Sequence, residues 1–171
     1  ISMSKILIVE DNKNRISKFK EGLIGHNVTI RSSYFSAKDA AFTGEQLNDF
    51  DVIFLDYDLV DTDKPYPERT FEEQYTGADF VLDLYMHLYE SIPPDKLPLF
   101  IIHSMNHQGA GLMQRMLLRG DVIDKEKVIL FPSAWESLDK FSDKFDPAHV
   151  QHCANGLSRF KNKDGTYYKT E

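Results

Sequence analysis

The sequence lacks several features that would define its class at once. Its 171 residues include one cysteine, Cys153, so it can form neither an internal disulfide nor a cysteine-based metal site. No apolar run approaches the roughly 20 residues needed to span a bilayer, and the first residues show no secretory pattern. Basic residues number 20 against 27 acidic ones, a net charge of −7 that argues against binding nucleic acid or anionic membranes through overall charge. We therefore expect a cytoplasmic protein with no membrane partner and no structural disulfide.

Short apolar runs alternate with amphipathic segments along the chain. The apolar runs predict strands at 5–9, 27–31, 51–55, 99–102 and 127–130. Apolar residues spaced three and four apart predict helices at 14–24, 36–47, 77–90, 109–119 and 133–145. In the first of these helices the predicted buried face consists of Ile16, Phe19, Leu23 and Ile24. Strands that alternate with helices predict an α/β fold, a parallel sheet with helices on both faces.

Polar side chains directly follow three of the predicted strands. These residues are Glu10 and Asp11, then Asp56 and Asp58, and then His103 and Ser104. In open α/β sheets ligands bind outside the carboxyl ends of the strands, at the point where the strand order reverses. If the order is 2-1-3-4-5, the carboxylates gather at that point, where only a cation or protons can neutralise their mutual repulsion. Their oxygen atoms suit Mg²⁺, or Mn²⁺ in its place.

The segments ILIVEDN, at 6–12, and FLDYDL, at 54–59, resemble those of response-regulator receiver domains, the CheY-like version of the flavodoxin-like fold. The similarity extends over roughly residues 4 to 145 and implies a three-layer sandwich with a five-stranded parallel sheet of order 2-1-3-4-5. It implies one receiver-like domain at 3–145, with a long loop at 59–76 and a C-terminal extension at 146–171. We expect the natural chain to begin at Met3.

The resemblance also assigns roles to the acidic residues. In receiver domains an acid pair binds Mg²⁺ together with an aspartate that accepts a phosphoryl group. By motif position Glu10 and Asp11 are that pair and Asp56 is the acceptor. A backbone carbonyl near Asp58 would supply a further metal ligand.

The chain departs from the receiver pattern where receivers report phosphorylation. A threonine or serine of the family is replaced by His103, and a lysine that precedes a proline is replaced by Phe131. The aromatic residue that usually lies three positions before that lysine is replaced by Val128. The resemblance therefore implies that the metal pocket is kept and the phosphorylation switch is lost.

The segment HSMN, at 103–106, together with the LDxDL end of the third strand, resembles a divergent branch of receiver-like domains proposed to process cyclic phosphates. This resemblance implies catalytic roles for Asp56 and His103, acting on a phosphate-containing small molecule or a nucleic-acid end. A histidine, with a reference pKa of about 6.5, can transfer protons near neutral pH. Nearby carboxylates would favour its charged form and a bound cation would oppose it. Asp58, Ser104 and Asn106 could contact the substrate or orient its neighbours, and Asn106 could instead cap the next helix.

Other functions stay open at this stage. The main alternative is a stand-alone receiver domain that is phosphorylated on Asp56 in a phosphorelay and signals by binding a protein partner. The Asp56-x-Asp58 pair is also typical of haloacid-dehalogenase phosphatases, although there it follows the first strand and here the third. A non-catalytic interaction module would need only the pocket, and His103 could then be a buried structural residue.

Overall fold

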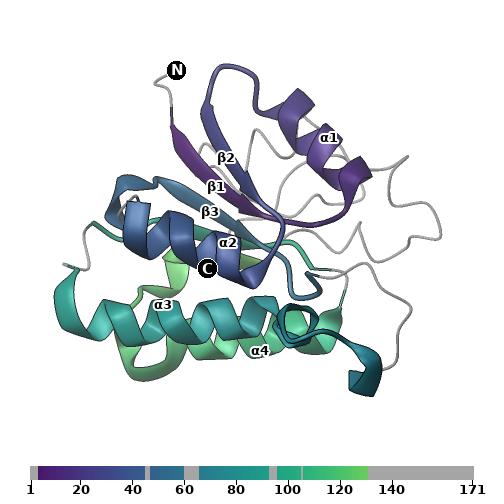
Figure 1. Cartoon of the computed structure of the whole chain (residues 1–171). Coiled ribbons are helices and arrows are strands. Elements are labelled where there is room, and N and C mark those ends of the chain that lie inside the picture. The colour runs from purple at the N-terminus through teal and green to yellow at the C-terminus, as the bar shows by residue number, and fades with distance from the viewer. Residues whose placement is uncertain (1–3, 45–46, 60–65, 93–95, 105, 131–171) are drawn as a thin grey trace, which may run out of the picture.

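One parallel sheet organises the part of the chain that the computed structural model describes, residues 4–44, 47–59, 66–92, 96–104 and 106–130. The strands lie in the order β2-β1-β3-β4-β5 (Figure 1). They are β1 (Lys5–Val9), β2 (Asn27–Arg31), β3 (Val52–Leu55), β4 (Leu99–Ile102) and β5 (Val128–Leu130). The parallel α/β arrangement and the strand order from β2 to β4 confirm the sequence-based prediction, and β5 pairs with the outer side of β4.

Helices cover both faces of the sheet. They are α1 (Lys13–Gly22), α2 (Tyr34–Asp39), α3 (Gly77–Ser91) and α4 (His107–Leu118). Figure 1 shows α1 on one face and the other three on the opposite face. A π-helical turn, Ala40–Gly44, extends α2, and short 3-10 helices lie at Leu47–Asp49, Tyr66–Glu68, Glu72–Gln74, Arg119–Asp121 and Lys125–Lys127. The helix predicted at 133–145 and the extension predicted at 146–171 lie outside the described residues. None of the described helices has the length and apolar character required to cross a membrane.

A polar side chain caps the N-terminus of each α-helix. These caps are Asn12 for α1, Ser33 for α2, Thr76 for α3 and Asn106 for α4. Each cap accepts a hydrogen bond from an otherwise unpaired backbone N–H of the first turn. At α1 and α4 the cap comes only a few residues after a strand, so these helices begin close to the carboxyl edge of the sheet.

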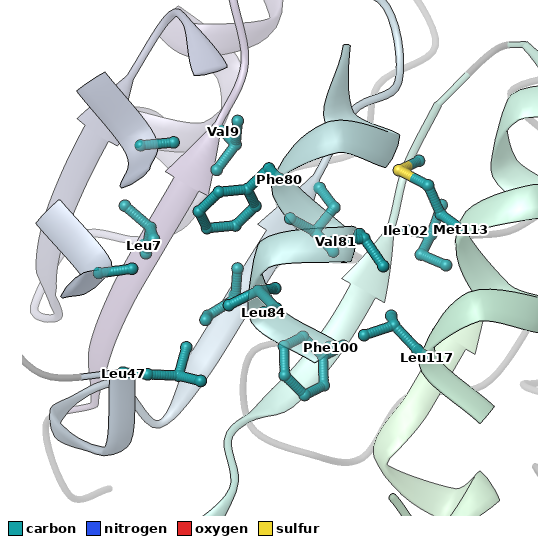
Figure 2. Close-up of a cluster of buried hydrophobic side chains, with 14 of the residues drawn as sticks. Leu7, Val9, Leu47, Phe80, Val81, Leu84, Phe100, Ile102, Met113 and Leu117 are labelled. Atoms are coloured by element: carbon teal, nitrogen blue, oxygen red, sulfur yellow. The ribbon is translucent and has the colours of Figure 1, made fainter. Parts of the chain in front are cut away.

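Two apolar cores lie on the two faces of the sheet. Leu7 and Val9 of β1 belong to the larger core, which Phe80, Val81 and Leu84 of α3 help to fill (Figure 2). The alternate residues of β1, Ile6 and Ile8, belong to the smaller core beneath α1. This alternation follows from the two-residue repeat of a strand. Because both faces are covered, the polar residues at the strand ends enter a largely dry environment.

One predicted core position and the extent of one predicted helix are wrong. Ile24 is 80% exposed because α1 ends at Gly22, so Ile24 is no longer on the helical face that Phe19 occupies. The helix predicted at 36–47 is shorter in the structure. The regular α-helix α2 ends at Asp39, and the chain continues as the π-helical turn. These differences lie away from the carboxyl edge of the sheet.

Candidate functional site

The sheet brings Glu10, Asp56 and His103 together. Glu10 follows β1, Asp56 follows β3 and His103 follows β4. Their backbones extend the ladder, because the Asp56 N–H donates to Val9 O at 3.1 Å and the His103 N–H donates to Leu55 O at 2.9 Å. One potential ligand atom from each side chain lies within 4.8 Å of the others. All three residues are at least 98% buried, with exposures of 0%, 2% and 1%.

His103 lies on the α1 side of the sheet. Its ring packs edge-on against Phe19, with centroids 5.0 Å apart, and against Phe54 at 6.1 Å. Its Nε2 lies 3.6 Å from Oε1 of Glu10. Burial lowers the pKa of His103 to about 4, although neighbouring Asp56 opposes this shift. Asp56 favours the charged form of the histidine, as expected for a nearby carboxylate, but desolvation outweighs this effect and the pKa falls overall.

The sequence analysis missed Arg15, which enters the same cluster. Its Nε donates to Oε1 of Glu10, and its Nη2 lies 3.3 Å from Oε2 of Glu10 and 3.1 Å from Oδ2 of Asp56. Burial lowers the pKa of Arg15, but its hydrogen bond with Glu10 and the surrounding acids outweigh that effect and raise the pKa overall. One sequence feature could have drawn attention to Arg15. It lies in the first turn of a helix, where the helix dipole disfavours a cation unless acidic groups are nearby.

The pKa values of Asp56 and Asp11 are both raised in the folded protein. Burial, followed by the charge of Glu10, raises the pKa of Asp56 to about 8. Burial and the charge of Asp56 raise the pKa of Asp11 to about 6. The Asp11 backbone N–H donates to Oε2 of Glu10 at 3.0 Å, and Asp11 itself is partly exposed. Of the predicted metal ligands, the structure brings Glu10 and Asp56 into close contact with His103, with Asp11 at the rim.

Asp58, Ser104 and Asn106 form a separate polar group at the start of α4. Asn106 Oδ1 accepts from the Gly109 N–H at 2.9 Å, so Asn106 caps the helix. Ser104 Oγ accepts from the Asn106 N–H at 3.1 Å, and Asn106 Nδ2 donates to Oδ2 of Asp58 at 3.5 Å. These three residues therefore shape the turn that leads from β4 into α4.

A hollow of about 470 Å³ lies beside this turn. It is lined by Tyr57, Asn106, Gln108, Gly109, Leu112 and Arg115. Gly109 allows the Tyr57 ring to lie against α4, because a Cβ there would come within 2.3 Å of the ring. The hollow offers an aromatic ring, two amides and a guanidinium at the carboxyl edge of the sheet, where ligands bind in folds of this kind.

The residues of the cluster suit a divalent cation. Glu10 and Asp56 provide buried carboxylates that need a counter-charge, and His103 in its neutral form provides a nitrogen lone pair. Carboxylates suit Mg²⁺ and Mn²⁺, and an imidazole shifts the preference toward transition metals. The guanidinium of Arg15 now lies between the same carboxylates, so an ion bound there must compete with it.

Comparison with known proteins identifies the fold. Neither a family model nor a curated protein sequence matches this chain. Among solved structures, the phosphorylated cyanobacterial phytochrome response regulator RcpA is similar with a TM-score of 0.57 and 15% identity, covering 94% of this chain and 100% of that one. The CheY-like receiver domain from Methylobacillus flagellatus has a TM-score of 0.46 and 22% identity, covering 85% and 100%. The similarity to RcpA, which has the higher TM-score of the two, shows that this chain has the fold of that response regulator.

Proposed function

We propose that this receiver-fold protein binds a divalent metal, Mg²⁺ or Mn²⁺, in its acidic pocket and acts on phosphoesters, in particular by opening cyclic phosphates, and does not work as a phosphorylation switch. Glu10, Asp56 and His103 would hold the metal, with Asp11 at the rim. The observation that carries the proposal is the position of His103, with Nε2 3.6 Å from Glu10 and inside the cluster that contains Asp56. A histidine at the end of β4 replaces the small hydroxyl expected of a receiver.

Each group in the pocket would have its own role in the reaction. A bound metal would polarise a phosphoryl oxygen and position a water molecule. His103, neutral because burial lowers its pKa, offers a lone pair that can hold the metal or accept a proton from water. The proton that His103 accepts from water could then pass to the leaving oxygen, while Asp56 would stay ionised as a ligand of the metal.

The substrate class follows from the surroundings of the pocket. Asn106 lines the hollow together with Tyr57 and Arg115, and its Nδ2 donates to Asp58, two residues after Asp56. An aromatic face and a guanidinium suit the base and phosphate of a nucleotide. We therefore propose a phosphate-containing small molecule, such as a 2′,3′-cyclic nucleotide, or a nucleic-acid end that carries a cyclic phosphate.

The decisive experiment measures hydrolysis of 2′,3′-cyclic nucleotides and of RNA ending in a cyclic phosphate, with Mn²⁺ or Mg²⁺ present. His103→Ala and His103→Gln should each reduce turnover by about 10²–10⁴-fold, the usual contribution of a general acid or base. His87→Gln is the matched control, since His87 lies on α3 against Phe42 and away from the pocket. A loss below about threefold in both His103 variants would make His103 a structural residue.

The second candidate is a stand-alone receiver that signals through a protein partner. It is favoured by the position of Asp56 at the end of β3 in a fold shared with a phosphorylated response regulator. Against it, Arg15 pairs with the Asp56 carboxylate, and position 103, where a receiver would carry a hydroxyl, is a histidine. A wild-type protein that hydrolyses none of these substrates, yet forms a long-lived phospho-Asp56 with acetyl phosphate, would favour this candidate. A cytoplasmic location suits both and stays a prediction.

A further inference from the structure

Arg15 is the third residue of α1, yet its side chain leads back to the strand ends. The cap at Asn12 fixes the start of the helix, because Asn12 Oδ1 accepts from the N–H groups of Asn14 and Arg15 at 3.0 and 3.1 Å. The Arg15 side chain is only 15% exposed. A cation in a first turn ordinarily extends into solvent, so the acidic cluster is what holds this one.

One nitrogen of Arg15 serves two carboxylates from different strands. Nη2 lies 3.3 Å from Oε2 of Glu10 and 3.1 Å from Oδ2 of Asp56. The side chains of Glu10 and Asp56 are 0% and 3% exposed, so Arg15 is the most accessible member of this trio. The guanidinium therefore contacts both acids, and the Arg15 side chain is the member of this trio with the most contact with solvent.

While both are ionised, two buried carboxylates so close together require a positive charge nearby, because desolvation and mutual repulsion both oppose their charged forms. A divalent ion and a guanidinium would both satisfy them. The two cannot share the position, since the same oxygens would have to serve both and the like charges would repel.

We propose that Arg15 is a displaceable counter-ion that occupies the acidic pocket when no metal is bound and must swing outward when a divalent ion enters. The proposal rests on the metal-binding part of the proposed function and is independent of the phosphoesterase part. It makes Arg15 the residue that sets metal affinity, because binding must first release the guanidinium. It also makes metal binding and opening of the pocket one event, since the side chain that leaves is the one facing solvent.

The test compares the full-length wild type, Arg15→Gln and Lys18→Gln by calorimetric titration with Mn²⁺ and by thermal melting in EDTA. Lys18→Gln removes the same charge from the same helix, where Lys18 pairs loosely with Glu21 at 4.0 Å on the surface. We expect Arg15→Gln to melt at a lower temperature in EDTA, to bind Mn²⁺ about tenfold more tightly, and to regain its stability with the metal. Lys18→Gln should bind as the wild type does.

Equal or weaker Mn²⁺ binding by Arg15→Gln would overturn the proposal, as would the failure of wild type and variant alike to bind at millimolar concentration. If Arg15→Gln does not fold, an NMR measurement on the wild-type protein tests the proposal by itself. The NMR signal of the Arg15 Nε–H group, assigned with Arg15→Lys, should move on Mg²⁺ addition toward the position of solvated arginines. A signal that stays unchanged while Mg²⁺ binds would overturn the proposal.

The two proposals fail in different ways. Competition between Mn²⁺ and Arg15 in a protein that opens no cyclic phosphate would remove the phosphoesterase function and leave the counter-ion role standing. Hydrolysis of cyclic phosphates by the wild type, together with an unchanged affinity of Arg15→Gln for Mn²⁺, would support the phosphoesterase function and remove the counter-ion role.

Discussion

Asp56 shows how a fold can change the chemistry of one residue. Its carboxyl group would have an ordinary pKa of 3.8, but burial and the neighbouring Glu10 raise the pKa to about 8. Between these two values the folded protein binds more protons at Asp56 than the unfolded chain does. The free energy of unfolding therefore falls as pH rises through this window, and the full loss is reached above the folded pKa.

This shift predicts a pH dependence of the metal-free protein. In EDTA, the melting temperature of the wild type should fall between pH 6.5 and 8.5, and Asp56→Asn should lack this component. Asp11, with a pKa of about 6, and His103, with a pKa of about 4 in the folded state and 6.5 in the unfolded state, still titrate in the lower part of this window. They are present in both proteins, so the difference in slope between wild type and variant reports on Asp56. Thermal melting at half-unit pH intervals measures the slope. Identical slopes in the two proteins would show that Asp56 is ionised in the fold.

The sequence predicted which residues gather at this site, but it did not predict the environment of each side chain. Topology alone indicated that Glu10, Asp56 and His103 would gather, because parallel strands end at one edge. The pKa of His103 and the place of Arg15 depended on packing that no motif encodes. The ring of His103 is desolvated by Phe19 and Phe54, and the long Arg15 side chain could have pointed to solvent equally well from its position in the helix.

At the scale of elements, the start of α3 is locked against the end of β3. The Gly77 N–H donates to Tyr57 O at 2.8 Å, and a Cβ at Gly77 would lie 1.9 Å from the backbone oxygen of Asp56. No side chain larger than hydrogen fits between the two elements. The glycine is thus required by the close approach of α3 to the residue at the centre of the site.

Gly77→Ala should therefore destabilise the protein by about 1–3 kcal/mol, the range for overpacking a well-packed region. The matched control is Gly111→Ala in α4, where a Cβ would meet only the mobile end of Arg115 at 3.2 Å. That variant should be neutral or more stable by about 1 kcal/mol, because alanine is the better helix former. Urea unfolding of the three proteins measures both effects. Equal stabilities would mean that α3 can move away from Asp56 at no cost.

The elements themselves were predictable to different degrees. The strands β1, β2, β3 and β4 begin within one residue of their predicted positions. The central strands β1, β3 and β4 were the easiest to recognise, since a strand between two helical layers is largely a continuous apolar run. Helix ends were less certain. The cap at Ser33 begins α2 two residues earlier than the apolar pattern of 36–47 indicates, and the π-helical turn then replaces its second half.

At the scale of the whole molecule, we expect metal binding to be coupled to folding, because the proposed ligands Glu10, Asp56 and His103 follow β1, β3 and β4 and gather only in the folded sheet. An ion that binds the folded state alone stabilises it by mass action, by about 1.4 kcal/mol at ten times its dissociation constant. For a chain of this size that corresponds to about 3–6 °C in melting temperature. Since His103 would contribute an imidazole in the proposed site, we expect Mn²⁺ to give a larger shift than Mg²⁺ at equal concentration.

Variants locate the ion within the cluster. Glu10→Gln and Asp56→Asn should each remove the metal-dependent rise in melting temperature, because both carboxylates lie in the converging group. His103→Gln should keep a rise with Mg²⁺ while losing the preference for Mn²⁺, since glutamine offers oxygen in place of imidazole nitrogen. Asp11→Asn should keep most of the rise, because Asp11 lies partly exposed at the rim. A different result would contradict this assignment: loss of the metal-dependent rise in melting temperature in Asp11→Asn, with an unchanged rise in Glu10→Gln. The ion would then bind at the outer edge of the pocket, and His103 would be a core residue beneath α1.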